Sequence, residues 1–304
     1  MRFVVYKLPK ITASGTSGKE FVYLDPELTD WVRGSDINDE KVAVGATVSQ
    51  IYSAAPADNF WHMYSDDDPV KEADSYRGHA KGVSLFDTNT GFWLIHSVPN
   101  FPSTKSFSYP ATAEKYGQSF FCFSMEVQHL AELAEHWKYI QASPYFINIP
   151  TKFSTRFPTL KNVEARQSLP RSATQFWTAK PIRTVQGVTL MAYAKHKKFD
   201  GDIWNDLISR QNKVTLAVES WLNGSGDDLH TTCTANSQVQ NTFSDAENPR
   251  QIAYNGMRMA TRTQGAELRD LKVHTIQVQY DEFQIEMFQI GANFCIVKKR
   301  LDAE

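Results

Sequence analysis

The sequence predicts an α/β chain of the mixed α+β kind, because candidate strands alternate with candidate helices along most of its length. The chain has 304 residues, of which 41% are hydrophobic and 12% are aromatic. A chain of this size and composition can bury a substantial core, and its length suits one large domain or two ordinary ones.

The first half offers strands, one open choice and one clear helix. Residues 1–6 are typical of a strand, whereas residues 42–55 suit a strand or a helix, since their periodicity does not decide. Residues 120–125 predict another strand. Residues 126–140 predict an amphipathic helix, because apolar side chains recur there at helical spacing; they are Val127, Leu130, Leu133, Ala134 and Trp137.

Two histidines of this predicted helix, His129 and His136, are seven positions apart and therefore lie on nearly one face. Metal ligands on a helix are more often four positions apart. We therefore expect both side chains to be partly exposed on the surface.

The second half begins with a stretch that is typical of a connector. Residues 143–185 carry several Pro, Ser and Thr residues. Beyond them, residues 189–194 and 213–221 predict strands around a helix near 203–210, and residues 283–288 and 293–297 predict two more strands.

A β-hairpin is predicted at the centre of the first half. Two apolar runs, residues 83–86 and 92–95, flank the turn-forming sequence Asp-Thr-Asn-Thr-Gly at 87–91. A five-residue loop places Phe86 opposite Phe92 and Gly82 opposite His96. In this register His96 is a diagonal neighbour of Lys81.

The hairpin is also the candidate functional site. His79 and Lys81 are two positions apart, so on a strand their side chains leave the same face, and His96 would approach them from the neighbouring strand. Lysine supplies a fixed positive charge, and a histidine can act as nucleophile, acid or base. A phosphate group is the ligand that suits such a cluster, although an isolated His-x-Lys pattern is also common on solvated strands.

Longer motifs resemble one family. Gly-His-Ala-Lys-Gly-Val at 78–83 and Gly-Phe-Trp-Leu-Ile-His-Ser-Val-Pro-Asn-Phe-Pro at 91–102 are similar to the signature of the deoxyribonuclease II family. The spacing between His79 and His96 matches without an insertion. Shorter segments resemble the same family at 3–9, 116–118, 193–195 and 198–199.

This resemblance implies the architecture of the phospholipase D superfamily. Two similar halves, here residues 1–150 and 151–304, would pack as a pseudo-dimer, each a mixed β-sheet flanked by helices. Each half normally contributes one His-x-Lys motif to a shared cleft. No internal repeat is evident in the sequence, so this symmetry is implied by the resemblance alone.

The resemblance also implies metal-independent, acid-active hydrolysis of DNA without a cofactor. One neutral histidine attacks phosphorus and forms a phosphohistidine, while a second, protonated histidine donates to the leaving oxygen. Lysines and an amide stabilise the charge. His79, Lys81 and His96 are the catalytic candidates, and Asn100 is a candidate phosphate contact, with packing of a proline-rich turn as the alternative.

The second His-x-Lys motif is replaced. The family pattern aligns without a gap from Phe243 and places Pro249, Arg250 and Gln251 where His, Ser and Lys are expected. The alignment is anchored downstream by Met259, Arg262, Gln264, Gly265, Glu267 and Arg269. Arg250 can still bind a phosphate through a forked contact, but it cannot serve as acid or nucleophile.

His196 and Lys198 form another His-x-Lys pattern and are a possible substitute site in the second half. In the family alignment, however, His196 replaces an aromatic residue. We expect more strongly that His196 is exposed on the surface than that it lies in the cleft.

Two functions therefore follow. The first is a deoxyribonuclease II-like endonuclease whose turnover is weakened by the missing motif. The second is an inactive homologue that binds nucleic acid or serves as an effector or structural protein. A third arrangement, in which one half-site works across a homodimer, predicts activity that falls with dilution.

Composition sets further bounds. The net charge of −2 gives no overall attraction to nucleic acid, so contacts with DNA need a local basic patch. No apolar run is long enough for a membrane span, and residues 1–6 do not resemble a signal peptide. We expect the acidic run at 66–69 to be a solvated loop, with a cation site as the less favoured alternative.

The cysteines bear on the cellular compartment. Only Cys122, Cys233 and Cys295 occur, and Glu114 occupies the position where the family normally has a partner for Cys122. The family is secreted or lysosomal, whereas few cysteines and no evident leader suggest an intracellular chain or a trimmed one.

Overall fold

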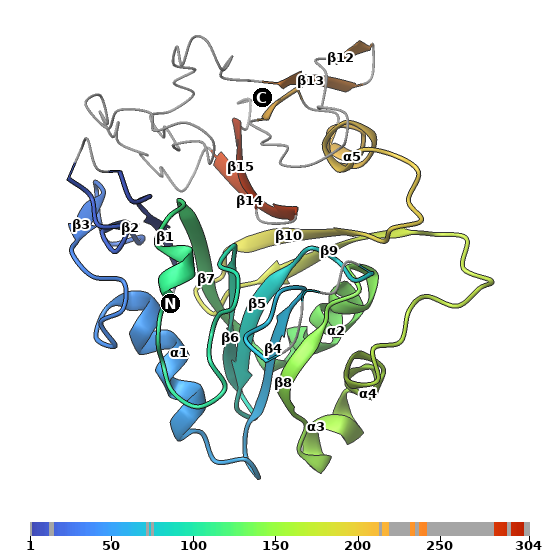
Figure 1. Ribbon diagram of the computed structural model, residues 1–304. Coiled ribbons are helices and arrows are strands. Elements are labelled where there is room, and N and C mark those ends of the chain that lie inside the picture. The colour runs from blue at the N-terminus through green and yellow to red at the C-terminus, as the bar shows by residue number, and fades with distance from the viewer. Residues whose placement is uncertain are drawn as a thin grey trace.

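The computed structural model describes residues 2–11, 15–70, 73, 76–212, 215–218, 232–234, 237–241, 283–290 and 293–300, with side chains up to residue 212 (Figure 1). Its main feature is an eight-stranded sheet with the order β3-β2-β1-β7-β6-β5-β4-β8. The strands are β1 (Arg2–Lys7), β2 (Phe21–Leu24), β3 (Val32–Gly34), β4 (Phe60–Ser65), β5 (Lys81–Phe86), β6 (Thr90–His96), β7 (Gln118–Glu126) and β8 (Pro144–Asn148).

Every neighbouring pair in this sheet is antiparallel. The expectation of a mixed sheet was therefore wrong for this part of the chain, whereas the mixed α+β class is confirmed. The reason is clearest at β5 and β6, because only residues 87–89 join them and a link this short permits only an antiparallel pair.

Helices and loops cover both faces of the sheet. On one face lies α1 (Ala43–Ser53), whose buried residues pack with Phe3, Met63 and Leu94. On the other lie α2 (Leu130–Tyr139), α3 (Thr151–Arg156) and α4 (Thr159–Glu164), which Figure 1 shows opposite α1. The central strands are therefore buried on both sides, which explains their nearly continuous apolar sequence.

The open choice at 42–55 is a helix, and the predicted helix at 126–140 is confirmed as a short 3₁₀ turn at Val127–His129 followed by α2. The connector predicted for 143–185 was wrong. That stretch contains β8, α3, α4 and all of β9 (Trp177–Arg183), and Phe153, Phe157 and Leu160 belong to the core beneath the sheet.

The strands predicted farther along are confirmed where the structure describes them. They are β10 (Thr189–Lys195), β11 (Thr215–Val218), β14 (Phe283–Ile290) and β15 (Asn293–Arg300), with two more strands, β12 (Thr232–Thr234) and β13 (Ser237–Asn241). The predicted helix near 203–210 is a π-helix, Ile203–Ser209, continued by α5 (Arg210–Asn212). The two-half organisation with a boundary at 150 stays a prediction.

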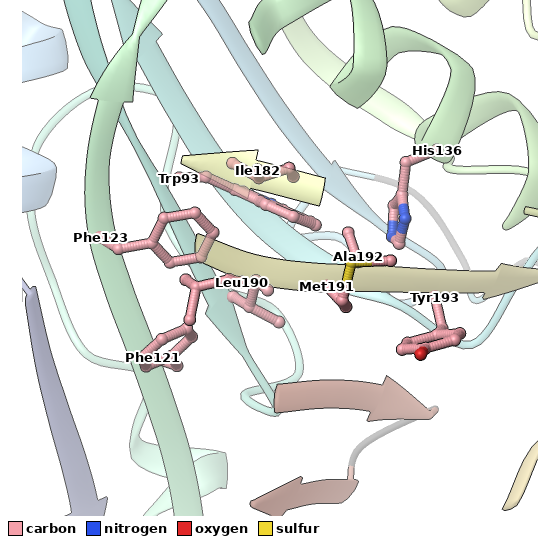
Figure 2. A pocket seen from close by; sticks show the side chains of 10 residues that line it. Trp93, Phe121, Phe123, His136, Ile182, Leu190, Met191, Ala192 and Tyr193 are labelled. Carbon is pink, nitrogen blue, oxygen red and sulfur yellow. The ribbon is translucent and has the colours of Figure 1, made fainter. Parts of the chain in front are cut away.

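His136 corrects another expectation, since it is buried and not partly exposed. It extends from α2 towards Trp93, with 5.1 Å between the ring centroids, in a small apolar pocket where α2 and the β9–β10 hairpin meet the sheet (Figure 2). Burial lowers the pKa of His136 to about 4. His129 is partly exposed, as expected.

Within the described part of the chain, none of the helices has the length and apolar character that a membrane span requires.

Candidate functional site

The β5–β6 hairpin forms, but its register differs by one residue from the predicted one. Lys81 lies directly opposite His96, and Gly82 lies opposite Ile95. The loop is shorter than expected, because the Asp87 amide donates to the Thr90 carbonyl over 2.9 Å and closes the turn. Directly opposed residues share a face of the sheet, so Lys81 and His96 are closer neighbours than the predicted diagonal pair.

His79 precedes β5 and is not part of it. The segment before the strand approaches the end of α2, where the Gly78 amide donates to the Gln141 carbonyl over 3.3 Å. A Cβ atom on Gly78 would lie 1.8 Å from the Ile140 carbonyl oxygen, so only glycine fits this approach. The turn leaves the His79 side chain 62% exposed at the edge of the sheet.

His79 and Lys81 both contact the carboxylate of Asp66, which the sequence analysis had placed in a solvated loop and not in the site. Asp66 Oδ2 lies 2.5 Å from His79 Nδ1, and Asp66 Oδ1 lies 2.6 Å from Lys81 Nζ. Asp66 directly follows β4, whose last residue, Ser65, pairs with Lys81. The predicted convergence of His79 and Lys81 therefore occurs through one shared partner.

The acidic run is consequently not a solvated loop, and that expectation was wrong. The Asp66 side chain is only 12% exposed, and Asp68 is buried with Oδ1 accepting from the Val70 amide. The position of Asp66 in the sequence, directly after a strand, would have predicted this contact if the partner strand had been known. A carboxylate that follows a residue paired with Lys81 lies beside Lys81. The pairing of β4 with β5 was needed to see this.

The charges of the site stabilise the ionised carboxylate. Burial raises the pKa of the Asp66 carboxyl, but the hydrogen bonds and charges of His79 and Lys81 outweigh it, so the pKa lies below its ordinary value. Asp66 is therefore ionised at mildly acidic pH, and the Lys81 side chain, 3% exposed, has its charge paired.

His96 is enclosed. Its Nδ1 accepts a hydrogen bond from the Val98 amide over 3.2 Å, and its ring packs edge-on against Phe101 with centroids 5.3 Å apart. Burial, and then the charge of Lys81, lower the pKa of His96 to about 3. His96 is thus a neutral, buried neighbour of Lys81 and is closed to solvent, and its catalytic role stays a prediction.

The backbone and side-chain amides of Asn100 both form hydrogen bonds within the protein. Its backbone amide donates to the Asp67 carbonyl over 2.8 Å, and its side-chain amide donates to Asp67 Oδ1 over 3.2 Å. Its φ of 55° is left-handed, a conformation that asparagine tolerates better than most residues. These contacts support a structural role that fixes the acidic turn next to Asp66.

His196 is buried, at 1% exposure, so the expected surface position was wrong. Its Nδ1 accepts from the Lys198 amide over 3.1 Å, and its Nε2 lies 3.0 Å from Ser168 Oγ. Ser168 Oγ in turn accepts a hydrogen bond from the side-chain amide of Gln141, and the backbone carbonyl of Gln141 accepts one from the Gly78 amide. His196 thus belongs to a hydrogen-bonded chain that ends at the turn before His79, while Lys198 is exposed.

The replaced motif at Pro249, Arg250 and Gln251 lies outside the described residues. In the described ranges, no group of three or more His, Cys, Asp or Glu side chains is arranged to hold a metal ion. Chemistry without a metal or cofactor stays a prediction.

An exposed aromatic residue, Tyr76, lies three positions before His79. Its side chain is 80% exposed, which is unusual for a large ring. The same turn carries Arg77, whose guanidinium donates to the Arg166 carbonyl over 3.0 Å.

Comparison with known proteins adds a family match. The family model described as deoxyribonuclease II matches residues 2–262. Cell-death-related nuclease 7 of Caenorhabditis elegans is 83% identical over 237 residues, which are 78% of this chain and 65% of that protein. Deoxyribonuclease-2-alpha of Bos taurus is 34% identical over 235 residues, which are 74% of this chain and 64% of the relative. The chain therefore spans slightly less than two thirds of these relatives.

Proposed function

The chain belongs to the deoxyribonuclease II family, and on this premise we propose that it cleaves DNA phosphodiesters slowly, with His79 as nucleophile and Lys81 as phosphate-binding cation. The observation that carries the proposal is the placement of an exposed imidazole and a lysine on one carboxylate, at 2.5 and 2.6 Å. The match of the family model includes all three residues.

The proposed step begins with a neutral His79. Its Nε2 lone pair attacks phosphorus, a P–N bond forms and the P–O bond to the leaving nucleoside breaks. The leaving oxygen takes up a proton from solvent. Water later attacks phosphorus and breaks the P–N bond, which releases a phosphate monoester and returns His79 to its neutral form. Lys81 partly neutralises the phosphate, and the imidazolium formed by attack remains hydrogen-bonded to Asp66.

The weakness of the proposed turnover follows from the missing acid. His96 and His196 each accept a hydrogen bond at Nδ1, so each ring carries its proton on Nε2. That atom is buried in His96 and faces Ser168 in His196, so neither proton is placed to reach a leaving oxygen. The aligned second motif offers Pro249, Arg250 and Gln251. Loss of a placed general acid reduces the rate by about 10²- to 10⁴-fold.

Tyr76 supports nucleic acid as the ligand. An exposed tyrosine ring can stack on an unpaired base, and base–aromatic stacking contributes about 1–3 kcal/mol per base. Its position before His79 would place a base next to the reacting phosphate, which favours single-stranded or locally opened DNA.

The test is plasmid nicking at about pH 5 with excess chelator. We expect slow nicking that His79→Ala abolishes and that His129→Ala, a partly exposed histidine on another element, retains. Activity that falls steeply on dilution would indicate the homodimer arrangement.

Binding without cleavage is the second candidate function, and the replacement of His and Lys by Pro249 and Gln251 favours it. Arg250 retains the ability to hold a phosphate. Absence of nicking at high protein concentration, together with DNA retardation that depends on Lys81, would decide for this function and against the nuclease.

A further inference from the structure

We infer that Asp66 is a positioning residue, which holds His79 in the tautomer that leaves Nε2 unprotonated and turned towards solvent. The inference rests on the proposed function, because a defined tautomer matters only if His79 acts on a substrate. It extends that function to a residue that contacts no substrate atom itself.

The first step of the argument is hydrogen-bond chemistry. An ionised carboxylate accepts hydrogen bonds but cannot donate them. The pKa of Asp66 lies below its ordinary value, so the contact of 2.5 Å with His79 requires a proton on Nδ1. In the neutral ring, Nε2 then carries the lone pair that a nucleophile needs.

The second step is rigidity. His79 is 62% exposed, whereas Asp66 is 12% exposed and lies in a turn that is held at the next residue, Asp67. Ser65 Oγ accepts from the Asp67 amide over 3.1 Å, and Asn100 donates twice to Asp67. Lys81 holds the other carboxylate oxygen at 2.6 Å. The carboxylate is therefore the fixed end of the His79 contact.

The third step is the charge that develops during reaction. Attack by Nε2 leaves a positive charge on the ring, and a carboxylate on Nδ1 stabilises that charge without changing its own protonation. The groups around Asp66 are Lys81, His79 and the buried His96. Because His96 stays neutral, the carboxylate is shared by one permanent cation and one ring that becomes charged.

The primary test reads the tautomer directly. In the full chain with ¹⁵N-labelled histidine, long-range ¹H–¹⁵N spectra at a pH where the ring is neutral should show Nδ1 protonated and Nε2 bare, with His79→Ala used for assignment. Asp66→Asn should produce a mixture of tautomers, because an amide can donate or accept. Equal mixtures in the native protein would overturn the inference.

The second test is kinetic. If the native chain nicks DNA, Asp66→Asn should lower kcat by about 10²- to 10⁴-fold with little change in KM, whereas Asp66→Glu should recover part of the loss. Asp58→Asn is the matched control, because Asp58 is 72% exposed and pairs with Lys152 on the surface. Thermal unfolding of each variant verifies that the fold is retained.

The two proposals fail in different ways. Nicking that depends on His79 but persists in Asp66→Asn overturns the positioning role and leaves the nuclease intact. A single tautomer that is lost in Asp66→Asn, without nicking by the native chain, supports the hydrogen bond by which Asp66 fixes the tautomer of His79 and overturns the nuclease.

Discussion

Lys81 and His96 face each other directly across the β5–β6 ladder, and one of them is a paired cation while the other is an enclosed neutral imidazole. The charge of Lys81 adds to burial in keeping His96 unprotonated. The two residues of the pair have different surroundings: Lys81 contacts Asp66 at the edge of the sheet, and His96 packs within the core against Phe101.

Replacement of Lys81 by methionine should weaken DNA binding and flatten its dependence on salt. One phosphate contact contributes about 0.9 to the slope of log affinity against log salt concentration, so the slope should fall by about that amount. Retardation assays over a range of salt concentrations measure it. Lys152→Met removes a lysine that pairs with Asp58 on the surface and should leave the slope unchanged; an unchanged slope in Lys81→Met would exclude phosphate binding at this lysine.

Replacement of Tyr76 by alanine should weaken binding of a single-stranded oligonucleotide about 5- to 100-fold, because a stacked base is lost. Tyr76→Phe keeps the ring and should bind like the native chain. Fluorescence anisotropy with a labelled oligonucleotide gives both affinities. Equal affinities of Tyr76→Ala and Tyr76→Phe would show that the ring does not contact a base.

Replacement of Gly78 by alanine should abolish nicking while most of the core remains folded. The new Cβ atom would lie 1.8 Å from the Ile140 carbonyl oxygen, so the turn before His79 must move away from α2. At Gly201 the nearest atoms belong to the side chains of Asp206 and Phe199, at 3.1 Å, so Gly201→Ala is the matched control. Circular dichroism and nicking at about pH 5 separate loss of activity from loss of fold.

The free energy of unfolding should fall as the pH is lowered from about 6.5 towards 4. Burial lowers the pKa of His62 to about 3, below the 6.5 of an unfolded histidine, and His62 has no hydrogen-bond partner among the described residues. The unfolded chain therefore binds more protons in this window, and stability that is complete above pH 6.5 is lost as the pH falls.

For His62 alone, the loss between pH 7.5 and 4.5 is about 2–3 kcal/mol, since one pKa unit corresponds to about 1.4 kcal/mol. Denaturant unfolding at both pH values should show a smaller loss in His62→Phe than in the native chain. His129→Ala, which alters a partly exposed ring, should keep the native loss. An identical loss in all three proteins would contradict the assignment.

The sequence predicted the hairpin, because turn chemistry and strand periodicity are local, and it predicted the meeting of His79 with Lys81. It did not predict that His79 precedes the strand or that His96 is enclosed. The register was wrong by one residue, since the hydrogen bond between Asp87 and Thr90 shortens the loop in a way that composition does not reveal. Asp66 was missed for a different reason. Its partners are 13 and 15 positions away, and only the pairing of β4 with β5 brings them together.

The buried histidines were harder to predict. His136 and His196 are polar residues that the sequence placed on the surface, but tertiary packing encloses them beside Trp93 and Ser168. Such burial depends on neighbours that come from distant segments. The antiparallel sheet likewise followed from the order of hairpins, which strand propensity does not specify.

Strands β4, β5, β6 and β7 are neighbours both along the chain and across the sheet. This order affects which substitutions the chain tolerates during evolution. Asp66, His79 and Lys81 lie within residues 66–81, and the β4–β5 pairing that brings Asp66 to Lys81 is local in sequence, which favours fast formation. On the proposed function, substitutions around position 250 are therefore expected to leave the meeting of Asp66, His79 and Lys81 in place.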